Sequence, residues 1–118
     1  MSQDIQKSLQ PRRYPRRDFE VRVGVLLSGQ YQVCRSKDIG EGGISLISEQ
    51  DFGQGARILL SFQIPSAEGT KGEFVSIIGT ILSVRREGNQ FLSGIAFDHL
   101  DFNYKRQIRS YVASKKFQ

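Results

Sequence analysis

Hydrophobic and polar residues alternate along most of the middle of the chain, with the period of two that is typical of a strand with one buried face. The clearest run starts at Phe19 and continues with Val21, Val23, Val25 and Leu27, and it alternates with Glu20, Arg22 and Gly24. Further segments of this character lie at 31–37, 44–48, 56–64, 73–85 and 90–97. The pattern predicts six short strands.

Turn-forming residues separate these segments. Ser28-Gly29-Gln30 indicates a hairpin turn, and Glu87-Gly88-Asn89 indicates another. The glycine-rich stretch 38–43 predicts a tight loop that ends the second strand. Gly79 stands inside the fifth segment, where glycine favours a bulge or a bend that lets a small sheet curl and close. We therefore expect an antiparallel barrel rather than an open sheet.

The last segment changes its period. Apolar residues recur at i, i+4, i+7 and i+8, which is the spacing of one helix face: Tyr104, Ile108, Tyr111 and Val112. Asp101 is the expected N-cap of this helix. The apolar face is expected to pack on the barrel, although a basic amphipathic helix can also bind a membrane or an acidic partner.

Composition limits the class of protein. The chain has 118 residues, enough for one domain, and its 17 Lys and Arg against 12 Asp and Glu give a net charge of +5. The excess lies at the ends, because residues 1–17 and 101–118 each hold five basic residues and one acidic residue. A nucleic-acid-binding barrel would instead expose aromatic residues among basic ones, whereas Phe62, Phe74 and Phe91 are expected in the core. That class remains an alternative.

Catalytic and metal chemistry find little support. One cysteine and one histidine, Cys34 and His99, cannot complete a zinc site, and no third group marks them as a nucleophile and base. The alternation predicts that Tyr31 and Val33 face the interior, with Cys34 on the opposite face. We therefore expect no enzyme, no metal and no cofactor.

The chain also lacks a long apolar run, so no transmembrane segment and no signal peptide are expected and a cytoplasmic location is the default. Residues 1–9 are expected to form a flexible tail, and residues 10–118 the domain.

Arginines concentrate just ahead of the first strand, at positions 12, 13, 16 and 17. A guanidinium binds a phosphate or a guanine edge through two parallel hydrogen bonds and stacks on bases. Pro11 and Pro15 disfavour a helix there, so these side chains are expected to project from an extended or turned arm. The glycines that follow Asp38 leave backbone N–H groups open to an anion, although the stretch lacks the lysine and hydroxyl of a P-loop.

These residues resemble the PilZ domain, a bacterial receptor module for cyclic di-GMP. Its RxxxR motif is matched by Arg12 and Arg16, with Arg13 and Arg17 as a second frame. Its [D/N]xSxxG motif is matched from Asp38 to Gly43, except that Gly40 replaces the serine. The resemblance covers about residues 10–115.

The resemblance implies an all-β fold, a six-stranded antiparallel barrel with a C-terminal helix. It also implies a receptor or adaptor whose N-terminal arm changes when cyclic di-GMP binds and which then signals to an unidentified effector protein. The implied ligand-binding residues are Arg12, Arg13, Arg16, Arg17, Asp38, Gly40, Gly42 and Gly43. Whether one ligand or a stacked pair binds stays open.

The missing serine suggests affinity lowered by one hydrogen bond, about threefold to tenfold, so that Gly40→Ser should tighten binding. The alternatives are a PilZ-like protein-interaction module that binds no nucleotide and a small nucleic-acid-binding barrel.

Overall fold

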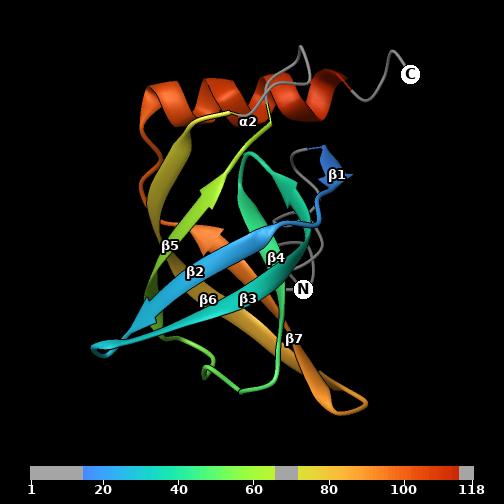
Figure 1. The fold of residues 1–118 in the computed structure, drawn as a ribbon, viewed down its shortest axis with the longest axis vertical. Coiled ribbons are helices and arrows are strands. Elements are labelled where there is room, and N and C mark those ends of the chain that lie inside the picture. The colour runs from blue at the N-terminus through green and yellow to red at the C-terminus, as the bar shows by residue number, and fades with distance from the viewer. Residues whose placement is uncertain (1–14, 66–71, 115–118) are drawn as a thin grey trace, which may run out of the picture.

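A computed structural model describes residues 15–65 and 72–114 of the chain (Figure 1). The expected N-terminal tail, Arg12 and Arg13 lie outside these residues. The elements are β1 (Arg16–Asp18), β2 (Arg22–Leu27), β3 (Gln30–Gly40), β4 (Gly43–Ser48), β5 (Arg57–Gln63), β6 (Phe74–Glu87), β7 (Gln90–Phe97) and α2 (Phe102–Ser114).

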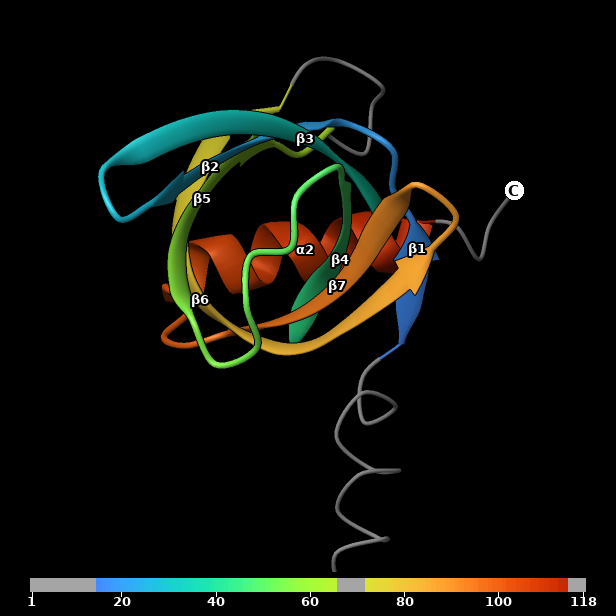
Figure 2. The same cartoon turned by 90° about the horizontal axis from the view of Figure 1, so that it is seen from below.

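Strands β2 to β7 form a closed antiparallel barrel. Neighbouring strands follow the order β3-β2-β5-β6-β7-β4, and the pairing of β3 with β4 closes the ring. Figure 2 shows the strands curving around the interior, and helix α2 lies across one end of the barrel in both views. The predicted six-stranded barrel with a C-terminal helix is confirmed.

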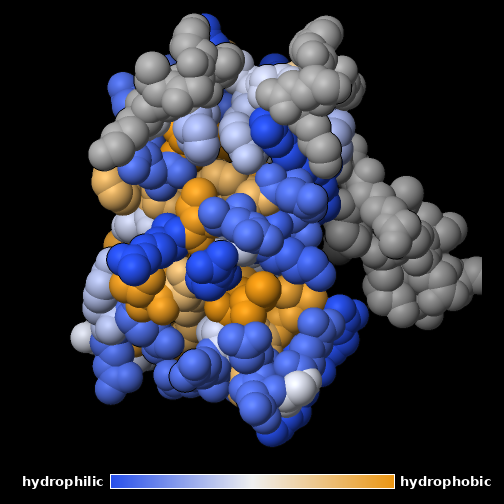
Figure 3. Space-filling model, turned by 45° about the vertical axis from the view of Figure 1, so that its right-hand side comes forward, coloured by the Kyte–Doolittle hydropathy of each residue, from blue (hydrophilic) through white to orange (hydrophobic). Residues whose placement is uncertain are grey.

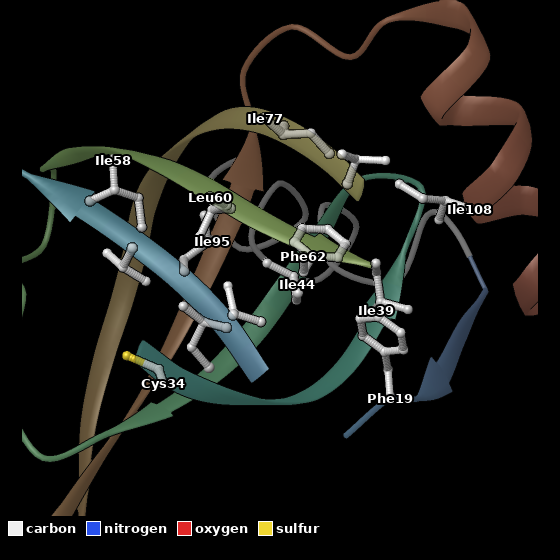
Figure 4. Close-up of a cluster of buried hydrophobic side chains, with 14 of the residues drawn as sticks. Phe19, Cys34, Ile39, Ile44, Ile58, Leu60, Phe62, Ile77, Ile95 and Ile108 are labelled. Carbon is white, nitrogen blue, oxygen red and sulfur yellow. The ribbon is translucent and has the colours of Figure 1, made fainter. Parts of the chain in front are cut away.

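The barrel interior is filled by side chains that alternate inward along each strand. Figure 4 shows this cluster, in which aliphatic residues of opposite strands meet around Phe62. Helix α2 covers one end with Ile108, which is fully buried, and Val112. The Asp101 carboxylate accepts a hydrogen bond from the backbone N–H of Asn103 at 2.8 Å, so the predicted N-cap is confirmed.

Strand β1 is a seventh strand where the sequence predicted only an arm. It pairs antiparallel with the end of β3, with Arg16 opposite Gly40 and Asp18 opposite Asp38. It lies on the edge of β3 that β2 leaves free, because the pairing of β2 with β3 ends at Arg35.

Buried Ser36 fixes the connection between β1 and β2. Its hydroxyl donates to the backbone carbonyl of Phe19 and accepts a hydrogen bond from the Val21 N–H at 3.0 Å. The hydroxyl thus pairs one backbone donor and one backbone acceptor of this short connection where it lies against the barrel. The position of β1 on the barrel is therefore fixed in part by hydrogen bonds to a buried side chain of β3.

The predicted loop at 38–43 is wrong over its first half. β3 continues to Gly40, and only Glu41 and Gly42 form the turn to β4. The strand continues as far as Gly40 because both of its edges are paired there, with β1 on one side and β4 on the other. Backbone pairing outweighs the low strand propensity of glycine at this position.

Two predictions about facing direction are also wrong. Tyr31 and Val33 are 66% and 56% exposed, whereas Cys34 is 6% exposed, because Cys34 lies opposite the core residue Val23. Phe74 is 68% exposed, while Phe62 is fully buried as expected. The period of two was correct, but its phase is set by the pairing register.

The sheet irregularity of β6 is not at Gly79. The register shifts between Ile81 and Ser83, so the extra residue is Leu82, which is exposed. A Cβ at Gly79 would lie 2.6 Å from a methyl carbon of Ile95, so this glycine instead permits close packing between β6 and β7.

The surface carries scattered hydrophobic residues. Figure 3 shows one face, on which hydrophobic patches are separated by hydrophilic side chains.

Within residues 15–65 and 72–114, no helix has the length and apolar character that crossing a bilayer requires.

Candidate functional site

Arg16 and Asp38 meet on the outer surface of the barrel, where β1 lies beside β3. The Arg16 Nε donates to Oδ1 of Asp38 at 3.0 Å, and Nη2 donates to the same oxygen. Their side chains are 30% and 26% exposed, so the pair is accessible to solvent. The two motifs that the sequence analysis singled out are thus brought into direct contact.

Ser45 completes this group from the neighbouring strand. It lies on β4 directly opposite Asp38, and its hydroxyl oxygen accepts a hydrogen bond from Arg16 Nη2 at 3.4 Å. The sequence analysis did not select Ser45, because only the pairing of β3 with β4 places it beside Asp38. The site therefore combines a guanidinium, a carboxylate and a hydroxyl from three strands.

Gly40 allows β1 to approach β3. A Cβ added to Gly40 would lie 2.7 Å from the carbonyl oxygen of Pro15 and 3.2 Å from Cγ of Arg16. The close approach of the backbone just before β1 thus requires glycine at position 40. This approach places Arg16 over the end of β3.

Gly42 and Gly43 join the site to strand β7. The Gly42 carbonyl accepts a hydrogen bond from the Phe97 N–H at 3.0 Å, and a Cβ on Gly43 would overlap the carbonyl oxygen of Ile95. Both glycines were predicted to bring the chain close to a ligand. In the structure they also bring it close to a neighbouring strand, which is a role in packing.

Arg17 points to the other side of β1. Its Nη1 donates to the carbonyl of Tyr111 at 2.7 Å and to the hydroxyl of Ser114 at 2.9 Å. Its guanidinium carbon lies 4.0 Å from the centroid of the Tyr111 ring. The two arginine frames are therefore separated, since Arg16 lies at Asp38 and Arg17 lies at the end of α2.

A second ion pair joins the motif turn to helix α2. Arg109 Nε donates to Glu41 at 2.8 Å, and the Glu41 side chain is largely buried. The turn that follows Asp38 and the strand that carries Arg16 thus both contact the helix, through Glu41 and Arg17 respectively.

Cys34 has the properties of a core residue rather than those of a nucleophile. Burial raises the pKa of its thiol to about 11, so the thiolate is scarce at neutral pH. Among the described residues, 15–65 and 72–114, no group of three or more His, Cys, Asp or Glu side chains is arranged to hold a metal ion.

Solved structures show where this fold occurs. Inhibitor of motility (MotI/DgrA) from Bacillus subtilis matches with a TM-score of 0.78 and 14% identity over 88% of this chain and 50% of that one. The PilZ domain of YcgR from Escherichia coli, solved with c-di-GMP, matches with a TM-score of 0.70 and 16% identity over 92% and 94%. PlzA from Borreliella burgdorferi, solved in complex with c-di-GMP, gives 0.65 and 20% over 94% and 45%.

The chain spans about half the length of MotI and PlzA, and it spans nearly all of the YcgR domain. A comparison with curated protein sequences gave no match. The family model described as PilZ domain matches residues 10–114, which include both motifs and every strand and helix described above. This protein therefore belongs to the PilZ domain family.

Proposed function

We propose that this PilZ domain is a receptor for cyclic di-GMP and that it signals to a partner protein through its N-terminal arm. Two structurally similar proteins, YcgR and PlzA, were solved with that nucleotide bound. The observation that carries the proposal is the contact between Arg16 and Asp38 on an accessible surface. These are the cation and the carboxylate that a guanine nucleotide requires.

Binding would exchange one set of hydrogen bonds for another. The carboxylate of Asp38 would accept from the N1 and N2 donors of a guanine base, and the released guanidinium of Arg16 would bind a phosphate or the O6 and N7 edge of guanine. A partly exposed ion pair contributes about 0–1 kcal/mol, whereas each charge-assisted bond to the ligand contributes about 1.5–3 kcal/mol. The exchange favours the bound state.

Strand β1 lowers the cost of ordering the arm. Fixing a free residue costs about 1–2 kcal/mol, and the residues of β1 are held by pairing with β3. That part of the entropy loss does not oppose binding. Arg12 and Arg13 lie outside the described residues, and in this proposal they add further guanidinium groups from the same arm.

The proposed output is a shift in the arm and in what it touches. Arg16 holds β1 over the site while Arg17 holds the same strand against α2. A ligand that draws Arg16 away from Asp38 would favour a different position of β1 and would change the surface near the helix end. A partner protein that recognises only one of these surfaces would bind this domain in only one of its two states, with or without the ligand.

A PilZ module that binds proteins but no nucleotide is the second candidate. Gly40 stands in place of the motif serine, and the guanidinium of Arg16 already donates hydrogen bonds to the carboxylate of Asp38. In that case, the ion pair is a permanent part of the surface and nucleotide is never admitted.

Calorimetric titration of the full chain separates these candidates. Cyclic di-GMP is expected to bind with micromolar affinity, which corresponds to about −8 kcal/mol. GMP and a short single-stranded oligonucleotide serve as controls and are expected to bind much more weakly, because each lacks the paired guanines of the ring. Absence of cyclic di-GMP binding would favour the protein-interaction module, and tighter binding of the oligonucleotide would favour a nucleic-acid-binding barrel.

A further inference from the structure

The position of the motif serine, residue 40, has little room for a hydroxyl in this chain. Gly40 is buried, and a Cβ there would come within 2.7 Å of the Pro15 carbonyl oxygen. This neighbour is backbone, so it can move only if β1 itself shifts. A hydroxyl contributed from position 40 is therefore incompatible with the seated β1.

Ser45 places a hydroxyl beside the same carboxylate. Directly opposed residues of an antiparallel pair have Cβ atoms about 4.5–5.5 Å apart, and Ser45 is the register partner of Asp38. Both side chains face the outer surface, because the next residues in register, Ile39 and Ile44, are fully buried. The hydroxyl thus lies within a few ångströms of the groups proposed to bind the nucleotide.

The hydroxyl of Ser45 remains able to donate. Its contact with Arg16 Nη2, at 3.4 Å, uses the oxygen as an acceptor and leaves the O–H proton for another partner. On the far side Ser45 pairs with Gly94, which has no side chain, and the hydroxyl of Ser83 lies 2.9 Å from the position that a Cβ of Gly94 would take. Ser45 itself is half-buried, so a ligand that approaches along the outer surface can reach its hydroxyl.

We propose that Ser45 is a ligand-binding residue of this domain and supplies the hydroxyl that position 40 lacks. Its O–H would donate to a phosphate oxygen or a guanine acceptor once Arg16 leaves Asp38, and its oxygen would keep Arg16 oriented toward the ligand. Ser45 lies on a strand paired on both edges, so the position of its Cβ beside Asp38 is fixed before binding, and only the hydroxyl has to rotate toward the ligand. This inference depends on the proposed binding of cyclic di-GMP.

The test compares four proteins: wild type, Ser45→Ala, Ser45→Thr and the control Ser76→Ala, whose serine is exposed on β6. Each full chain is titrated calorimetrically with cyclic di-GMP, and its thermal midpoint is measured. Loss of the hydroxyl is expected to weaken binding about threefold to tenfold, with no matching loss of thermal stability. Threonine should restore affinity to within about twofold, and the control should match wild type.

The outcomes are distinguishable. Wild-type binding with unchanged affinity in Ser45→Ala would overturn the role of Ser45 and leave the receptor function intact. Equal weakening by alanine and threonine would show that residue 45 acts through packing, which also overturns the inference. Absence of binding by wild type would overturn the receptor function itself.

Discussion

The guanidinium of Arg17 packs on the ring of Tyr111, 4.0 Å from its centroid, while the guanidinium of the preceding residue, Arg16, contacts the carboxylate of Asp38. Neighbouring residues of a strand point to opposite faces, so β1 presents one arginine to the outer surface and one to helix α2. Two side chains that look equivalent in the sequence therefore have separable roles, one in proposed ligand binding and one in stability.

Arg17→Ala is expected to lower the free energy of unfolding by about 1–3 kcal/mol, because it removes two hydrogen bonds and a cation–π contact at the end of α2. Urea denaturation monitored by circular dichroism measures this change. Arg17→Lys should recover only part of it, since an ammonium lacks the planar fork. A loss no larger than that of Arg16→Ala would contradict the structural role of Arg17.

Arg16→Ala is expected to abolish measurable binding of cyclic di-GMP and to leave the thermal midpoint nearly unchanged. The first effect follows from loss of the proposed phosphate contact, and the second from the solvent exposure of the ion pair. Calorimetry and a thermal melt measure the two. Arg86→Ala is the matched control, because Arg86 is exposed on the β6–β7 hairpin. Retained affinity in Arg16→Ala would remove this residue from the site.

Gly40→Ser is now expected to weaken binding rather than to tighten it. The motif resemblance predicts that serine at position 40 would return one hydrogen bond to the ligand. In the structure, however, the new Cβ would lie against the carbonyl oxygen of Pro15. The serine would displace β1 and with it Arg16. Hydrogen exchange should show faster exchange of the Arg17 amide, and calorimetry should show lower affinity. Tighter binding with β1 still protected would mean that the strand adjusts without cost.

The barrel could be predicted from the sequence because strand signals are local. Alternation from Phe19 to Leu27 and the turn at Gly88 each depend on residues a few positions apart. The facing direction of the second strand was not predictable in this way, since both faces of residues 31–34 carry apolar side chains. Only the pairing of Cys34 with Val23 decides which face is inside.

The candidate site was predictable only in part. The motif resemblance indicated Arg16 and Asp38, which the structure places in contact. Ser45 was missed because it is seven residues from Asp38 along the chain and becomes its neighbour only through the register of β3 and β4. The separation of Arg16 from Arg17 was also missed, because the sequence does not reveal that the arm forms a strand.

Gly43→Ala is expected to destabilise the fold by more than about 2 kcal/mol, because the added methyl group overlaps the Ile95 backbone and β4 and β7 cannot separate without losing pairing. Urea denaturation measures the change. Gly24→Ala is the control: its Cβ would meet the ring of Tyr31, a largely exposed side chain that can rotate away. Similar stability in both variants would argue that Gly43 is required by a ligand rather than by packing.

Stability is expected to fall at alkaline pH through Cys34. Burial raises the pKa of its thiol from 9.0 to about 11, so the folded protein keeps a proton that the unfolded chain releases as the pH rises above 9.0. Release from the unfolded chain favours unfolding, and the contribution of this group is therefore fully present below that pH and declines toward 11.

Urea denaturation at about pH 8 and about pH 10.5 measures this loss, with Cys34→Val as the comparison because valine keeps a similar apolar volume without a titrating group. Lysines and tyrosines titrate in both proteins, so the difference between their pH slopes isolates the thiol. The wild type should lose more stability than the variant between the two pH values. Equal slopes would mean that the thiol meets solvent as readily in the folded barrel as in the unfolded chain, which the buried position of Cys34 opposes.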